Sequence, residues 1–313
     1  MPTKLRSRLI KPFQRATYLP LVVAVAAFAG VGAFLLNYSQ AATSAIPAEA
    51  ENGTLVTAKS MDSSGASGGK AVLFQPGTTG GGSGNEMPAG VSGNWTRIFT
   101  DEFNGTSLDK TKWDDNWFGQ TNMNGFEKLA SNIRFSNGSV ILGIGADDSG
   151  AVLTSNPYNS NNIKGGFTFG TGIYLEARIN FAGNGETVYN WPAWWTNSYN
   201  WPMTGETDIF EALGESATSN YHYGSDYSNH TANNSGPIPG VWANAYHTYG
   251  LYRKANKNEI YWDGKLIRSY DTHDGGAEQY LMLTSGTNGP DWPSVTGSQA
   301  DMKVDYVRAW RAN

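Results

Sequence analysis

The chain has 313 residues, of which only 16% are charged, and a net charge of −5. It has no Cys, which excludes disulfides and thiolate metal sites, and its four His lack the H-E-x-x-H spacing of a catalytic zinc site. No basic stripe is present, which argues against a nucleic-acid partner.

The N-terminal 41 residues have the order of a secretory signal. Basic residues and no acid occupy positions 1–17, an apolar run covers 18–36, and small residues follow. About 20 apolar residues also suffice to span a bilayer, so a cleaved signal peptide and a retained membrane anchor both stay open. Both interpretations predict a secreted or cell-surface protein, with membrane association only if the segment is retained.

Two short segments follow the leader. Residues 42–76 include the stretches AEAENG and ASGGKAVLF, which resemble the opening of carbohydrate-binding modules of the galactose-binding-like type. A piece of this size cannot bury a core alone, so we expect a pair of strands or a simple tether, with sugar binding left open. Residues 77–93 are rich in Gly and Ser, which is typical of a flexible linker.

Residues 94–313 carry strand patterns throughout. Strands are predicted at 95–103, 137–146, 172–181, 246–254 and 302–310, with a hairpin at 259–270. Asp263 and Gly264 supply the two positive-φ positions of a type I′ turn in that hairpin. The spacing of the strands and their apolar faces predict an all-β fold, a β-sandwich jelly roll of two curved antiparallel sheets.

An acidic cluster lies within one predicted strand. The stretch TGETDIFEALGE places Glu206, Asp208 and Glu211 within six residues. Alternation puts the first two acids on one face and Glu211 on the other, unless a β-bulge adds one residue. We therefore predict a bulge at Ile209–Phe210 that brings all three carboxylates to one face.

Three close carboxylates cannot all ionise freely, so at least one pKa rises. An unequal pair of carboxyls is what glycoside hydrolysis requires, namely a proton donor and an ionised partner. An exposed acidic face or a calcium site would also explain this motif taken alone. The nearby indoles favour a glycan cleft, because sugar rings present apolar faces; these are Trp191, Trp194, Trp195 and Trp201.

The order of motifs across residues 94–311 resembles glycoside hydrolase family 16, in its laminarinase-like branch with the bulged E-x-D-x-x-E motif. The matching stretches are FTDEFNGTSLDKTKW, FTFGTGIYLEARI, WPAWW, WPMTGETDIFE, YHTYGLYRKANKNEIYWDGKLIRSY and VDYVRAW. The resemblance implies a concanavalin A-like jelly roll and a retaining endo-β-glycosidase acting on β-1,3- or mixed-linkage β-1,3(4)-glucan. Thr207, where the family has Ile or Leu, should face away from the cleft.

The resemblance also implies residue roles. Glu206 would be the nucleophile, Glu211 the general acid and base, and Asp208 the residue that tunes the pair. The side chains expected to contact substrate are Trp191, Trp195, Trp201, Arg178 and His222. His222 could equally be a packed cross-strand residue, and His247 is expected to bond within the fold.

No cofactor is implied for catalysis, but family members carry a structural calcium ion away from the cleft. The matching positions are the side chain of Asp305 and the carbonyl of Gly138. The expected partner is a β-glucan polysaccharide, with no obligate protein partner. A non-catalytic glycan-binding jelly roll and a cell-wall transglycosylase remain alternatives, because a fold does not dictate its function.

Overall fold

The computed structural model describes residues 58–62, 70–74, 87–117, 122–123, 126–157, 165–234, 236–287 and 294–313. The chain divides into two units, 1–78 and 79–313. In the first unit, β1 (Ala58–Asp62) and β2 (Lys70–Phe74) form the antiparallel strand pair expected within 42–76. The leader 1–41 lies outside the described residues, among which no helix has the length and apolarity to cross a bilayer.

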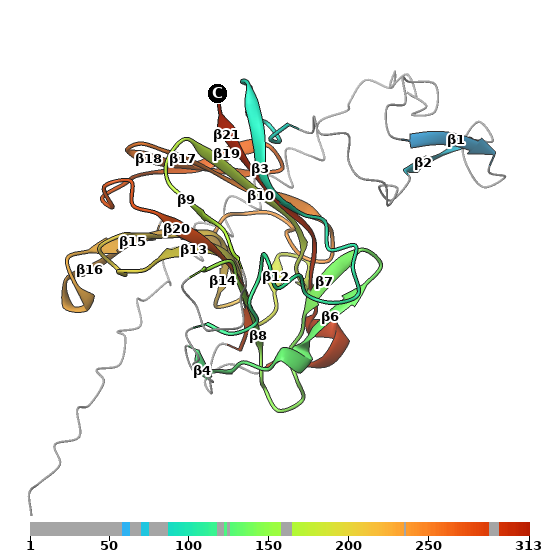
Figure 1. The fold of residues 1–313 in the computed structure, drawn as a ribbon. Coiled ribbons are helices and arrows are strands. Elements are labelled where there is room, and N and C mark those ends of the chain that lie inside the picture. Colours follow the sequence, from blue (N-terminus) through green and yellow to red (C-terminus); the bar gives the residue numbers. More distant parts are fainter. Residues whose placement is uncertain are drawn as a thin grey trace, which may run out of the picture. The chain divides into compact units, whose positions relative to one another are not determined.

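The second unit is a sandwich of two antiparallel sheets, seen as two curved layers in Figure 1. The eight-stranded sheet has the order β19 (Lys265–Asp271), β18 (Lys257–Trp262), β17 (His247–Lys254), β10 (Ile173–Asn180), β21 (Met302–Ala312), β7 (Ser139–Leu142) and β6 (Ile133–Ser136), with β3 (Trp95–Asp101) also paired to β21. The seven-stranded sheet has the order β16 (His230–Asn234), β15 (Ser216–Gly224), β14 (Glu206–Leu213), β13 (Trp191–Ser198), β20 (Gln279–Gly286) and β8 (Ala151–Thr154), with β9 (Thr168–Phe169) also paired to β20. This is the predicted jelly-roll architecture.

Smaller elements connect these strands. They are the pairs β4 (Asn122–Met123) with β5 (Phe126–Glu127) and β11 (Gly183–Asn184) with β12 (Thr187–Val188), and the 3₁₀ turns η3 (Ala130–Asn132), η4 (Tyr227–Asn229) and η5 (Gly297–Ala300). The predicted hairpin is β18–β19, and Asp263 and Gly264 have φ values of 48° and 70°, as a type I′ turn requires.

The core lies between the two sheets and is rich in aromatic side chains. Phe181, which follows β10, stacks on Phe210 of β14 with ring centroids 3.8 Å apart, and Tyr249 of β17 packs edge-on against both rings. Trp194 is fully buried and donates its indole N–H to the carbonyl of Tyr249. Trp194 is therefore a core residue, while the opposite faces of the strands remain free for function.

The outer face of the eight-stranded sheet holds the end of the predicted linker. The backbone N–H of Ala89 donates to the carboxylate of buried Glu176 on β10, and the hydroxyl of Tyr306 donates to the same side chain. Residues 87–90 thus belong with the second unit.

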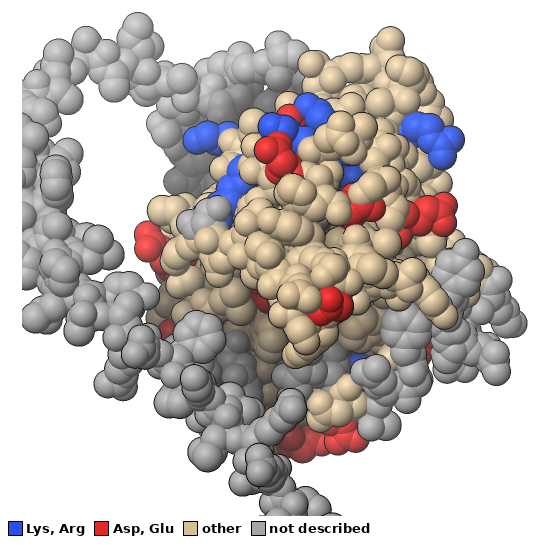
Figure 2. All heavy atoms as spheres, turned by 90° about the vertical axis from the view of Figure 1, so that its left-hand side faces the viewer, with Lys and Arg blue, Asp and Glu red and all other residues tan. Residues whose placement is uncertain are grey.

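On the face drawn in Figure 2, the described Lys and Arg residues stand beside Asp and Glu, with large uncharged areas between them.

Candidate active site

The acidic strand β14 contains the predicted bulge. In its pairing with β15, Asp208 lies opposite Asn220 and Glu211 lies opposite Thr218. Three steps along β14 therefore match two steps along β15, so β14 holds one extra residue at Ile209–Phe210. The register with β13 shifts at the same place.

The bulge sends two consecutive side chains into the core. Ile209 and Phe210 are both fully buried in the cluster between the sheets. Thr207 also points inward, where its hydroxyl accepts a hydrogen bond from Asn258. The phase of the strand is thereby restored, and the three acids line one pocket on the outer face, namely Glu206, Asp208 and Glu211.

Side chains outside the ladder satisfy the backbone groups that the bulge leaves unpaired. The indole N–H of Trp262, from the opposite sheet, donates to the carbonyl of Ile209 at 2.9 Å. The hydroxyl of Ser219 donates to the carbonyl of Asp208 at 2.7 Å. A buried carbonyl without a partner is costly, so these two donors stabilise the bulged conformation.

The pocket combines acids, indoles and imidazoles. Its lining residues are Phe126, Trp191, Ala193, Trp195, Trp201, Glu206, Asp208, Glu211, His222, His230 and Thr284. All three indoles predicted to contact substrate are among them. Apolar rings beside charged carboxylates suit a ligand with both apolar and hydroxylated faces, which is the surface that a sugar ring presents.

Glu211 is buried and firmly oriented. The indole N–H of Trp191 donates to its Oε1 at 2.8 Å, and Nδ2 of Asn220 donates to its Oε2 at 2.7 Å. Burial and the charge of Asp208 raise the pKa of Glu211 to about 8, against the opposing effect of these two donors. Glu211 is therefore a carboxylic acid near neutral pH and can donate a proton.

Glu206 has a different electrostatic environment. Burial and then the charge of Asp208 raise its pKa above the usual range, while the charge of nearby His222 lowers it. Asn197 on β13 also donates to its Oε2 at 3.1 Å, which favours the ionised form. Burial and Asp208 therefore favour the protonated form of Glu206, whereas His222 and Asn197 favour its ionised form.

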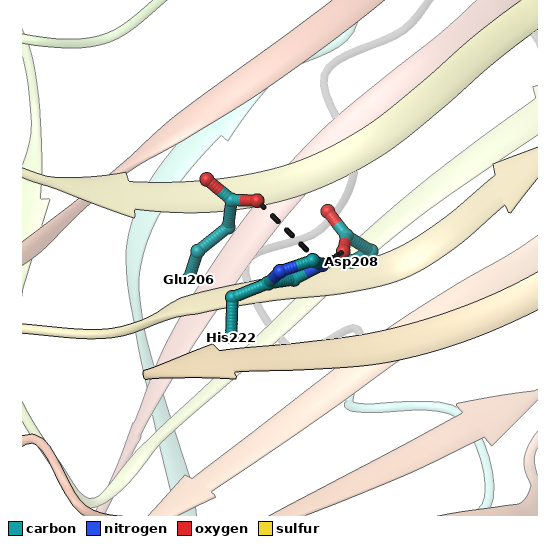
Figure 3. A group of neighbouring side chains, drawn as sticks. All are labelled: Glu206, Asp208 and His222. Atoms are coloured by element: carbon teal, nitrogen blue, oxygen red, sulfur yellow. Dashed lines mark ion pairs between the residues drawn. The ribbon is translucent and has the colours of Figure 1, made fainter. Parts of the chain in front are cut away.

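His222 on β15 lies between two of the acids, as Figure 3 shows. Its Nε2 is 3.1 Å from Oδ2 of Asp208 and 3.9 Å from Oε1 of Glu206. Burial lowers the pKa of His222, but Asp208, Glu206 and Glu211 outweigh it and raise this pKa to about 9. His222 is thus a cation at neutral pH that offsets part of the acidic charge.

Arg178 does not reach this pocket, which corrects its prediction as a substrate-binding residue. Its neighbours in the strand, Ala177 and Ile179, point into the core, so Arg178 lies on the outer face of the eight-stranded sheet. There its Nη1 is 2.7 Å from Oδ2 of Asp305, and its guanidinium lies 4.4 Å from the ring centroid of Tyr246. The acids occupy the opposite side of the sandwich.

The same contact bears on the predicted calcium site. Asp305 offers one carboxylate, of which Oδ2 is paired with a guanidinium, and Gly138 lies in the tight turn between β6 and β7. Among the described residues, Asp305 joins no group of three His, Asp or Glu side chains close enough to share an ion. Since calcium takes six to eight oxygens, an ion here would depend on backbone carbonyls and water, and the site stays a prediction.

Sequence reasoning missed several residues of the site. Asn197, Asn220 and His230 each contact an ionisable side chain of the pocket, but they come from three different strands. Phe126 and Thr284 complete the lining from further segments. Only strand register could have revealed them, although the spacing of His222 and His230 gave a weak signal. His247 bonds to Asp263 at 2.7 Å and so bonds within the fold, as predicted.

Known proteins resemble this chain in sequence and in fold. A family model described as "XgeA-like, catalytic GH16 domain" matches residues 170–242, which include the acidic strand and its two neighbours. The resemblance to glycoside hydrolase family 16 is confirmed. Among curated proteins, glucan endo-1,3-beta-glucosidase A1 of Niallia circulans is 26% identical over 258 residues, covering 68% of this chain. The chain spans 37% of that relative's length.

Solved structures support the fold. The endo-beta-1,3-glucanase of Pyrococcus furiosus superposes with a TM-score of 0.56 at 20% identity, covering 72% of this chain and 99% of that one. SCLam, described as a non-specific endo-beta-1,3(4)-glucanase from family GH16, gives a TM-score of 0.55 at 22% identity, covering 72% and 95%. At this identity the likeness shows a shared jelly roll.

Proposed function

We propose that the chain is a retaining endo-β-glycosidase that cleaves β-1,3- or mixed-linkage β-1,3(4)-glucan. The observation that carries the proposal is the bulge at Ile209–Phe210, which gathers three unequal carboxyls under indole walls. The named activities of the Niallia circulans and Pyrococcus furiosus proteins and of SCLam support this substrate class.

In the first step, Glu211 gives its proton to the glycosidic oxygen while the carboxylate of Glu206 attacks the anomeric carbon. The bond from that carbon to oxygen breaks, the shortened chain leaves with the proton, and a glycosyl ester forms on Glu206. His222 and Asn197 favour the ionised nucleophile before the attack.

In the second step, the ionised Glu211 removes a proton from water, and the resulting oxygen attacks the anomeric carbon. The ester bond to Glu206 breaks and the carboxylate is regenerated. Two inversions restore the original configuration, so the first product formed is the β-anomer. Asp208 lies beside His222 and contributes to the raised pKa of both glutamates.

The indoles supply the binding surface. Trp191 and Trp201 are partly exposed in the pocket wall, whereas Trp195 is mostly covered and donates its N–H to Thr284. Apolar sugar faces stacked on Trp191 and Trp201 would place a glycosidic bond above the acids. A pocket open to the surface fits internal cleavage of a long chain.

The proposal is tested with variants of the two glutamates on laminarin and lichenan. Glu211→Gln should lose roughly 10²- to 10⁴-fold in kcat on polysaccharide. Its kcat/KM should fall much less on an activated aryl glycoside, because this constant reports the first step and an acidic phenol leaves without a proton. Glu206→Gln should lose activity on both substrates, because it lacks the nucleophile. Near wild-type turnover by either variant on every glucan it cleaves would overturn the assignment.

A wider panel separates the alternatives. Wild-type protein is incubated with laminarin, lichenan, agarose, carrageenan and mucin O-glycans, and products are analysed by mass and by the anomer first formed. Glycan chains longer than those supplied would indicate transglycosylation, and binding without any cleavage would indicate a glycan-binding protein. We further propose export through residues 1–41, which N-terminal sequencing of secreted protein would test.

A further inference from the structure

A second imidazole lies directly behind His222. His230, the first residue of β16, has its Nε2 2.8 Å from Nδ1 of His222. The two ring planes are inclined by only 8°, with centroids 5.0 Å apart. Rings that are nearly parallel and meet at their nitrogen atoms are joined by a hydrogen bond.

The protonation state of His222 determines which of the two rings donates in this bond. As a cation, His222 carries a proton on both nitrogens, and its Nε2 lies 3.1 Å from Oδ2 of Asp208 and 3.9 Å from Oε1 of Glu206. Its Nδ1–H then points at His230, which must accept on Nε2 and remain neutral. Burial and the charge of His222 both lower the pKa of His230, in agreement with a neutral acceptor.

We propose that His230 is a positioning residue: its Nε2 accepts the Nδ1–H of His222 and holds that imidazolium against the carboxylate of Glu206. The proposal rests on the proposed function, in which Glu206 must be ionised to attack. His230 itself touches no reacting atom; it acts by keeping the cation of His222 in place.

The surroundings of His222 make such an anchor necessary. Three acids face it from β14, namely Glu206, Asp208 and Glu211, and His230 is the titratable group that faces it from β16. The ring of Trp201 packs against His230 with centroids 4.9 Å apart, which fixes the second imidazole in turn. Without the acceptor on His230, the His222 ring could turn away. Its positive charge would then no longer offset the negative charge of the acids.

A pair of variants isolates the hydrogen bond. His230→Phe keeps a ring against Trp201 but removes the acceptor, whereas His230→Gln keeps an acceptor oxygen. With His230→Phe, the acid limb of the kcat/KM profile on laminarin should move upward by about one pH unit, because Glu206 loses a nearby positive charge. With His230→Gln, the limb should lie close to that of the wild type.

A matched control comes from another histidine. His273 stacks on Tyr223 at 4.3 Å and is not among the residues that line the acidic pocket. His273→Phe removes an imidazole of similar packing and should leave the acid limb unchanged. Melting curves of all three variants monitor folding.

A readout without substrate separates this proposal from the proposed function. Imidazole titrations of the full chain are followed by two-dimensional ¹H–¹⁵N spectra. In the wild type, His222 should titrate well above pH 7 and His230 below its ordinary value. In His230→Phe, the His222 titration should move to lower pH. Absence of glucan hydrolysis would refute the proposed function and leave this measurement intact.

Several results would overturn the proposal. One is a wild-type titration in which His230 holds its proton to higher pH than His222. Another is a His230→Phe variant whose His222 titration and acid limb match those of the wild type. Equal shifts in the Phe and Gln variants would also refute it, because they would indicate a loss of packing rather than of an acceptor.

Discussion

The indole N–H of Trp191 donates to Oε1 of Glu211 at 2.8 Å, so one wall of the cleft also touches the proposed acid. This donor lowers the pKa of Glu211, which burial and Asp208 raise to about 8. Glu211 must be protonated to act, so kcat/KM should fall above about pH 8.

Trp191→Phe should therefore move the basic limb of the profile upward by about one pH unit, because a hydrogen bond to the carboxylate form is lost. The apolar wall is retained, so KM should change little. The measurement is the pH dependence of kcat/KM on laminarin. A basic limb that stays in place would show that the indole does not influence this proton.

A second prediction concerns the bulge. Trp262→Phe removes the donor to the carbonyl of Ile209 and should cost about 1–3 kcal/mol in unfolding free energy. It should also lower kcat, because the bulge positions Glu211. Trp194→Phe is the matched control: it removes an indole donor to the carbonyl of Tyr249 in the opposite sheet but leaves the donor to Ile209 in place. Both variants should melt earlier, but kcat should fall only in the first.

A third prediction follows from the position of Arg178. Its side chain and that of Asp305 are 39% and 36% exposed, so their ion pair should contribute less than about 1 kcal/mol. Arg178→Met should leave both kcat and KM on laminarin unchanged, and a raised KM would support the substrate-binding role predicted from the sequence.

The calcium prediction is tested by chelation: a melting temperature lowered by EDTA supports it, and an unchanged melting temperature contradicts it.

A fourth prediction concerns the reach of the cleft. Tyr227 is 83% exposed on η4, a turn capped by Asp226, and its ring centroid lies 5.8 Å from that of Trp201. A rigid exposed ring beside the cleft suits a more distant sugar. Tyr227→Ala should raise KM on long glucans by roughly two- to tenfold, since aromatic face contacts contribute about 0.5–1.5 kcal/mol.

Short oligosaccharides that end before Tyr227 should show no such change. Leu266→Ala is the control, because this residue is 49% exposed on β19 in the other sheet. An equal rise in KM for short and long substrates would argue against a distant sugar site at this ring.

A fifth prediction links activity to stability. The pKa of Glu211 is about 8 in the folded chain, above its ordinary value of 4.5, so the folded state binds this proton more tightly. Stability contributed by the protonated form is therefore lost as pH rises from about 4.5 through about 8. Glu211→Gln should melt at a higher temperature than the wild type at pH 8, and the difference should shrink at pH 5.

Particular residues show which features of the fold and of the site the sequence alone predicts. The bulge followed from a mismatch between the spacing of Asp208 and Glu211 and the two-residue period of a strand. The hairpin turn followed from Asp263 and Gly264, whose backbone conformation is set locally. Features controlled by neighbours in the chain were therefore predictable.

Features controlled by the packing of distant strands were not. Alternation shows that Arg178 shares a face with Glu176, but not which side of the sandwich carries the cleft. The contact between His222 and His230 depends on the register of β15 with β16. Long-range register is set by the whole core, which no single stretch of sequence encodes.

The bond from Trp262 to the bulge ties the chemistry to the interior. Trp262 is buried and cannot contact a sugar, but its hydrogen bond stabilises the bulge that positions Glu211. For the proposed activity, a substitution in the aromatic interior around Trp262 would therefore displace the carboxyls, even though it lies away from the substrate.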